Sequence, residues 1–296
     1  MDMTNNILII ARKEFSSLLN SRVLLIIIAW MLIVVFCTWY GNTYAPPGNL
    51  SNIVNWIHMG NDAVHDIIFV SFARSLYWDG AFLAIALGYI SMSEETKGKA
   101  LNTLLVKPVY RDTIITGKLL GILFYVIWVY IFVAAIYLVA MLVYFGLMLN
   151  SYSLLFSSYI PEFVGLLPWG FFIGLVCVFF FCSLTMLMCL IFKEKSFALF
   201  MSLLSWIFFY LIVNCQSFAD YIGFFMCKSL LGYNGGQTLS NMLCYLSVDL
   251  NAGILLSTKD LMGNFSSSIV HLFILLFYCF MALILTYIVF LRRDVV

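Results

Sequence analysis

Histidine and acidic side chains gather in one short stretch, between residues 58 and 66. His58, Asp62 and His65 recur at intervals of four and three residues, with Asp66 directly after them. As a helix, this stretch would carry metal-ligand side chains on one face. A solvated outer face explains the same pattern without a ligand, because polar residues at helical spacing usually face water. We therefore interpret it as an exposed polar surface.

A second distinctive set of side chains contains sulfur. Cys182, Met186 and Cys189 share one face of a long apolar run, and thiolate and thioether ligands suit Cu(I). The chain carries 14 Met, so such faces arise easily, and we favour packing as the explanation and predict no metal site.

Three further cysteines lie in a predicted outer segment, where one disulfide among them stays an open alternative: Cys215, Cys227 and Cys244.

Two opposite charges stand near the start of another apolar run. Arg74 and Asp79 are five residues apart. Charged side chains at membrane depth are costly, and they usually pair or face water. We place both at the outer membrane interface rather than in a translocation pathway.

The motifs of common catalytic and nucleotide-binding sites do not occur in this sequence. It contains no GxxxxGK[ST] phosphate-binding loop, no HExxH and no GxSxG. We expect no enzymatic activity and no cofactor in this chain, so that any ATP must be bound by a partner. The net charge of +1 and the lack of a long basic run argue against a nucleic-acid partner.

Composition indicates that lipid surrounds these residues. The chain is 64% hydrophobic and 10% charged, whereas a soluble domain carries about 25% charged residues. A helix of roughly 20 apolar residues crosses about 30 Å of hydrocarbon, and its backbone polar groups are paired internally. We predict an all-α membrane protein with six transmembrane helices: 23–40, a second that starts between 67 and 76 and ends at 92, 119–149, 166–192, 197–213 and 269–291.

Basic residues predict the orientation of these spans, because Lys and Arg concentrate in cytoplasmic loops. With a cytoplasmic N-terminus, twelve of the fifteen Lys and Arg residues lie inside, and only Arg74, Lys228 and Lys259 lie outside. Six spans then return the C-terminus to the cytoplasm. The prediction is one multi-pass domain over residues 1–296 in the plasma membrane, with both termini cytoplasmic.

Three segments are predicted not to span. Residues 1–22 form an amphipathic helix in the headgroup layer, or alternatively a helix packed on another protein. The inner loop 93–118 contains a short helix ended by Pro108, and a new helix starts at 111–113 and continues into the third span. Residues 214–268 form an apolar outer lid or re-entrant segment. The apolar face of the first helix comprises Ile7, Leu8, Ala11, Phe15, Leu18 and Leu19.

The inner loop resembles the signature region of type-2 ABC exporter permeases. Those permeases show a glutamate at the inner end of span two, then a Gly, a leucine pair, a Pro, an Arg and a Gly-Lys. The opening ARKEFSSLLNSR and the closing FLRRDV are also similar to that family, whereas Asn102 departs from the acidic residue that many members carry. The matching positions are Glu94, Glu95, Gly98, Leu101, Leu104, Leu105, Pro108, Arg111, Gly117 and Lys118.

The resemblance implies an exporter permease whose matching residues between Glu94 and Lys118 hold the coupling helix that touches a separate ATPase. Two ATPase copies, which bind ATP and Mg, would work with two permeases, and we predict a homodimer. The layout is also similar to the branch associated with nitrous-oxide reductase maturation. The cargo is not identified by the sequence. Two alternatives stay open: a non-transporting membrane scaffold or immunity protein, and an ATP-independent secondary transporter, which should carry a charge relay at mid-membrane.

Overall fold

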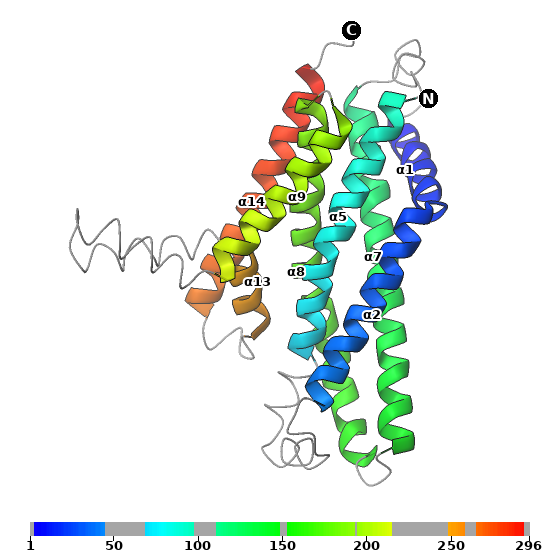
Figure 1. The fold of residues 1–296 in the computed structure, drawn as a ribbon, viewed down its shortest axis with the longest axis vertical. Coiled ribbons are helices and arrows are strands. Elements are labelled where there is room, and N and C mark those ends of the chain that lie inside the picture. Colours follow the sequence, from blue (N-terminus) through cyan, green and yellow to red (C-terminus); the bar gives the residue numbers. More distant parts are fainter. Residues whose placement is uncertain are drawn as a thin grey trace, which may run out of the picture. The chain divides into compact units, whose positions relative to one another are not determined.

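The computed structural model describes residues 3–44, 69–97, 111–148, 153–192, 194–214, 248–257 and 265–292. Across these ranges the chain is helical, without a strand, so the predicted all-α fold is confirmed (Figure 1). The chain forms two compact units, of which unit 1 comprises residues 1–87 and 108–175, and unit 2 comprises 88–107 and 176–296. The helices are α1 (Met3–Leu19), α2 (Arg22–Tyr44), α5 (Ser71–Lys97), α7 (Arg111–Met148), α8 (Ser153–Ile191), α9 (Lys195–Asn214), α13 (Val248–Ser257) and α14 (Phe265–Arg292).

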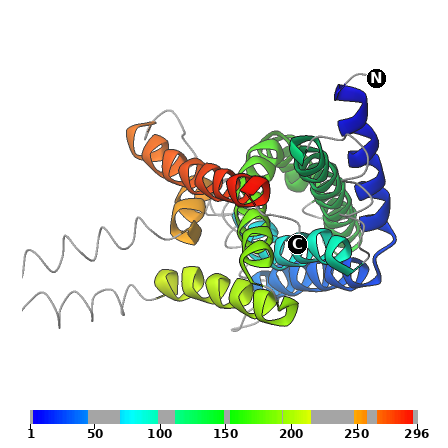
Figure 2. The same cartoon turned by 90° about the horizontal axis from the view of Figure 1, so that it is seen from above.

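In unit 1, α1 and α2 meet at a bend of 67°, which Figure 2 shows at the corner between them. Asn20 and Ser21 break the helix there, since the Ser21 N–H bonds the Leu18 carbonyl in a tightened last turn. The Ser21 carbonyl then accepts the N–H of Leu25 and begins α2. The bend lets α1 leave the direction of α2 and lie along α7.

The rest of unit 1 is held by aromatic and backbone contacts between α5, α7 and α8. Phe72 of α5 stacks on Tyr137 of α7 at 4.5 Å between ring centroids. The Tyr130 hydroxyl donates to the Leu76 carbonyl at 3.2 Å. A Cβ at Gly174 of α8 would lie 3.1 Å from the Tyr130 ring and hydroxyl. Small residues thus let helices approach closely, as is usual in lipid.

In unit 2, close contacts join five helices: α5 from Gly88 onward, α8 from Val176 onward, α9, α13 and α14. A Cβ at Gly88 of α5 would lie 2.7 Å from the Cys182 carbonyl oxygen of α8, so only glycine allows this approach. The Thr286 hydroxyl of α14 donates to the Ser183 carbonyl at 2.8 Å. The α13 helix packs on α9 and α14, where His271 Nδ1 and Asn251 Oδ1 lie 2.5 Å apart.

Within the described part of the chain, three helical segments are long and apolar enough to cross a membrane: Thr113–Ala140, Phe163–Ile191 and Ile269–Arg292. The bent pair of α1 and α2 would add a fourth span, and Lys195–Phe209 of α9 is apolar but shorter. These results support a membrane protein, while the full set of six spans and the orientation stay predictions.

Two helix boundaries can be compared with the predictions. The α7 helix begins at Arg111, within the predicted start. The apolar part of α8 is Phe163–Ile191, close to the predicted span 166–192, although the helix itself begins earlier, at Ser153. It continues through Pro161 and Pro168, each of which removes one backbone donor without ending the helix. Of the predicted outer segment 214–268, the helix α13 and the first residues of α14 are described.

Candidate functional site

The residues matched to the ABC permease signature cluster around the connection between α5 and α7. Glu94 and Glu95 belong to the end of α5, and Arg111 begins α7. The central positions lie outside the described residues, so their predicted role is not tested by the structure: Gly98, Leu101, Leu104, Leu105 and Pro108.

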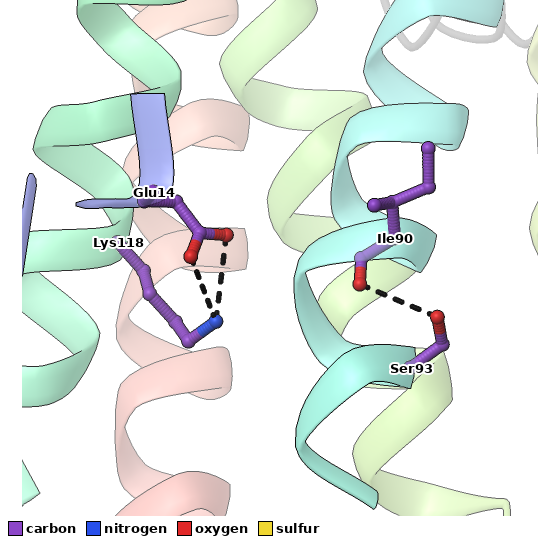
Figure 3. A network of polar contacts seen from close by, with 4 residues as sticks. All are labelled: Glu14, Ile90, Ser93 and Lys118. Carbon is purple, nitrogen blue, oxygen red and sulfur yellow. Dashed lines mark hydrogen bonds and ion pairs between the residues drawn. The ribbon is translucent and has the colours of Figure 1, made fainter. Parts of the chain in front are cut away.

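At the α7 end of this connection, Lys118 forms a buried ion pair with α1. Its Nζ donates to both carboxylate oxygens of Glu14, at 3.4 and 3.3 Å (Figure 3). Both side chains are buried. Because removing either partner would leave a buried charge uncompensated, this pair ties α1 firmly to the beginning of α7.

Two glycines of α7 let α1 come close enough for this pair. A Cβ at Gly117 would lie 2.8 Å from Ile10 Cβ, and one at Gly121 would lie 2.9 Å from the Ala11 carbonyl oxygen. The spacing of Gly117 and Gly121 is that of a GxxxG motif, which allows close helix packing. Here the motif packs α1 against α7 within one chain.

At the α5 end, the anchor is a single hydrogen bond in unit 2. Lys195, the first residue of α9, donates from Nζ to the Ser93 carbonyl at 3.1 Å. The Ser93 hydroxyl donates back to the Ile90 carbonyl at 3.3 Å (Figure 3). A cation near the C-terminal end of a helix also interacts favourably with the helix dipole. The end of α5 is therefore attached to the beginning of α9.

The connection between α5 and α7 contains one of the points at which the chain passes from one unit to the other. The chain passes between the two units at three points: after Leu87 within α5, after Lys107 and after Leu175 within α8. Two of these crossings lie inside continuous helices, and the third lies in the segment 98–110. This segment therefore joins the end of α5, in unit 2, to the beginning of α7, in unit 1.

The other predicted features occupy different places. Cys182 and Met186 are fully buried in unit 2, whereas Cys189 is partly exposed; the Cys182 carbonyl oxygen is the atom that Gly88 approaches. Asp79 of α5 is also buried, and its Oδ2 has no hydrogen-bond partner among the described residues. Arg74 is exposed, and the position of both residues at the outer membrane interface stays a prediction. The stretch of His58, Asp62, His65 and Asp66 lies outside the described residues.

Sequence reasoning missed Glu14 and Lys195 as anchoring residues. Glu14 falls between Ala11 and Leu18, two buried residues of α1, so its position on the buried side of the helix was a usable indication. The predicted apolar face also included Leu8, which is 56% exposed. Its exposure shows that the buried face of α1 is rotated away from Leu8 toward Glu14.

One protein-family model matches almost the whole chain. Residues 8–295 match the family described as ABC-2 family transporter protein. A search of curated proteins finds no significant match. The nitrous-oxide reductase branch is therefore not supported by a specific relative.

Proposed function

We propose that this chain exports its cargo with energy from separate ATPase subunits. The chain belongs to the ABC-2 transporter family and is thus a membrane permease subunit of an ABC transporter. The observation that carries the proposal is the family match over residues 8–295. The absence of a phosphate-binding loop from the sequence supports a separate ATPase. We place the transporter in the plasma membrane, with two permease copies and two ATPases that bind ATP and Mg.

The segment between α5 and α7 is the proposed contact with the ATPase. Leu101 and Leu105 would lie on one face of a short helix, and an exposed apolar face favours docking. Glu94 and Glu95 before it and Arg111 after it add charged positions at its edges. Movement of the bound ATPase would displace the segment as a docked element with two positions.

The anchors on either side support transmission of that movement. Displacement of the segment toward α7 would carry α1 along, because Lys118 and Glu14 join the two helices. At the other end, α5 would act on α9 through Lys195 and Ser93. Since the chain changes units within the segment, the proposed outcome is a change in the arrangement of the units that alternates access to the cargo.

Copurification tests the contact directly. The tagged chain is isolated with the ABC ATPase expressed beside it, and the double substitution Leu101→Asp with Leu105→Asp is compared with Asn102→Asp with Thr103→Asp. Both variants add two carboxylates, but the second pair faces away from the leucines in a helix. We expect the first variant to lose the ATPase and the second to retain it. Equal recovery of the ATPase with both variants would contradict the proposed docking face.

One observation favours the ATP-independent alternative. The buried carboxylate of Asp79 lies within α5, and its Oδ2 finds no donor in the described part of the chain. Intramembrane carboxylates often carry protons in transporters. The chain alone, reconstituted into vesicles that contain a pH-sensitive dye, should not conduct protons if it depends on an ATPase. Proton uptake that is abolished by Asp79→Asn would instead support the secondary transporter, while a scaffold would neither conduct protons nor bind an ATPase.

A further inference from the structure

An open apolar groove lies between α1 and α7, within unit 1. Its volume is about 580 Å³. From α1 it is lined by Leu8, Arg12 and Phe15, and from α7 by Phe124, Trp128 and Ile131, among others. Phe124 and Ile131 are 49% and 55% exposed. Large apolar side chains gathered on one surface indicate a binding surface for another apolar group.

Arg12 lies within the groove, with Leu8 one turn before it along α1 and Phe15 after it. Helices α1 and α7 advance in the same direction, because Ile10 meets Gly117 and Ala11 meets Gly121, while Phe15 meets Tyr125. Arg12 is therefore level with the turn of α7 that follows Gly121. The lining residues of α7 lie further along, with Ile131 about 15 Å beyond Gly121 at 1.5 Å per residue.

Arg12 is the charged side chain of this groove. It is exposed, and among the described residues it forms no ion pair, in contrast to the buried Lys118. A guanidinium offers several N–H donors in a fork that fits phosphate oxygens. Its aliphatic stem can follow an apolar surface while the charge stays in the headgroup layer.

We propose that the groove binds an anionic phospholipid, with the phosphate at Arg12 and an acyl chain along Trp128 and Ile131. From Arg12 toward Ile131 the lining is apolar, which matches the order of headgroup and tail in a lipid. An apolar surface of a second chain would fill the deeper part but leave Arg12 without an anion. The proposal concerns a lipid site of the membrane domain and does not depend on the ATPase.

Quenching of Trp128 by brominated lipids tests this site. The chain is reconstituted into phosphatidylcholine vesicles in which the same small fraction of lipid is bromine-labelled phosphatidylglycerol or bromine-labelled phosphatidylcholine. The Trp128 contribution is obtained as the difference between the chain and its Trp128→Phe variant. We expect phosphatidylglycerol to quench this contribution with about fivefold higher apparent affinity, because its headgroup is a net anion, whereas the choline ammonium cancels the phosphate charge of phosphatidylcholine.

Two charge variants test whether Arg12 causes the preference for phosphatidylglycerol. Arg12→Gln should bring the affinities of the two labelled lipids for the Trp128 site to within about twofold of each other, because the positive charge that favours the net-anionic headgroup is removed. Lys13→Gln removes a neighbouring exposed charge of α1 and should leave the preference unchanged. Equal quenching by both lipids in the unmodified chain, a preference that survives Arg12→Gln, or an unquenched Trp128 would each overturn the proposal. The last result would indicate a protein surface in the groove.

Discussion

At the α7 end of the proposed coupling segment, one ammonium group is held by both carboxylate oxygens of a buried glutamate. At the α5 end, the partly buried Lys195 donates one hydrogen bond to the backbone carbonyl of Ser93. The first anchor cannot open without leaving a buried charge unpaired, whereas the second can exchange its bond for water at small cost. We infer that α7 and α1 move together, while the end of α5 can part from α9 during a transport cycle.

Breaking the ion pair should have the largest effect. Lys118→Met leaves Glu14 buried without its partner, and we expect a loss of about 3–5 kcal/mol in the free energy of unfolding. The measurement is thermal or denaturant unfolding of the purified chain in detergent.

The control for this prediction removes both charges. Glu14→Gln together with Lys118→Met should recover most of the lost stability, because no uncompensated charge then remains. A double variant as unstable as Lys118→Met would show that the charge pair is not what joins the two helices.

The second-largest loss of stability is expected when the close packing of α1 on α7 is disturbed. Gly121→Ala would place a Cβ 2.9 Å from the Ala11 carbonyl oxygen, so the helices must separate, at a cost of about 1–3 kcal/mol. Gly165→Ala in α8 is the matched control, because no atom lies within 4 Å of its Cβ position. Alanine there should stabilise the helix by up to about 1 kcal/mol. If both variants unfold alike, the contact between α1 and α7 is looser than described.

The smallest effect is expected at the α5 end. Lys195→Met removes the donor to Ser93 and should cost about 1 kcal/mol. Faster hydrogen exchange should be confined to the last turns of α5. Glu194→Gln, which alters an adjacent exposed charge, should leave that exchange unchanged. A stability loss at Lys195 as large as that at Lys118 would remove the contrast between the two ends.

The sequence predicts the helices better than it predicts how they are joined. The start of α7 at Arg111 follows from Pro108 and from the apolar run beyond it, which are both local features. The pair of Glu14 and Lys118 joins residues 104 positions apart, and it depends on α1 folding back along α7, which no local spacing encodes.

The same limit applies to the candidate site. Leucine spacing and the signature residues predict a docking segment whose central residues lie outside the described ranges, whereas the burial of its neighbours is a feature of the folded structure. Lys118, predicted to belong to the coupling residues, is turned toward Glu14 and buried, so any coupling role passes through α1. The burial of Asp79 by the packing of α5 is likewise a tertiary feature that its position near Arg74 does not reveal.

A distance between the two units under turnover tests the central claim most directly. Spin labels at Lys13→Cys of α1 and Ser196→Cys of α9, two exposed positions in different units, are attached in a background whose native cysteines are replaced and whose ATPase is still bound. We predict that the distribution of distances shifts between the nucleotide-free complex and the complex trapped with ATP and vanadate. An identical distribution in both states, while the complex hydrolyses ATP, would contradict the proposed coupling.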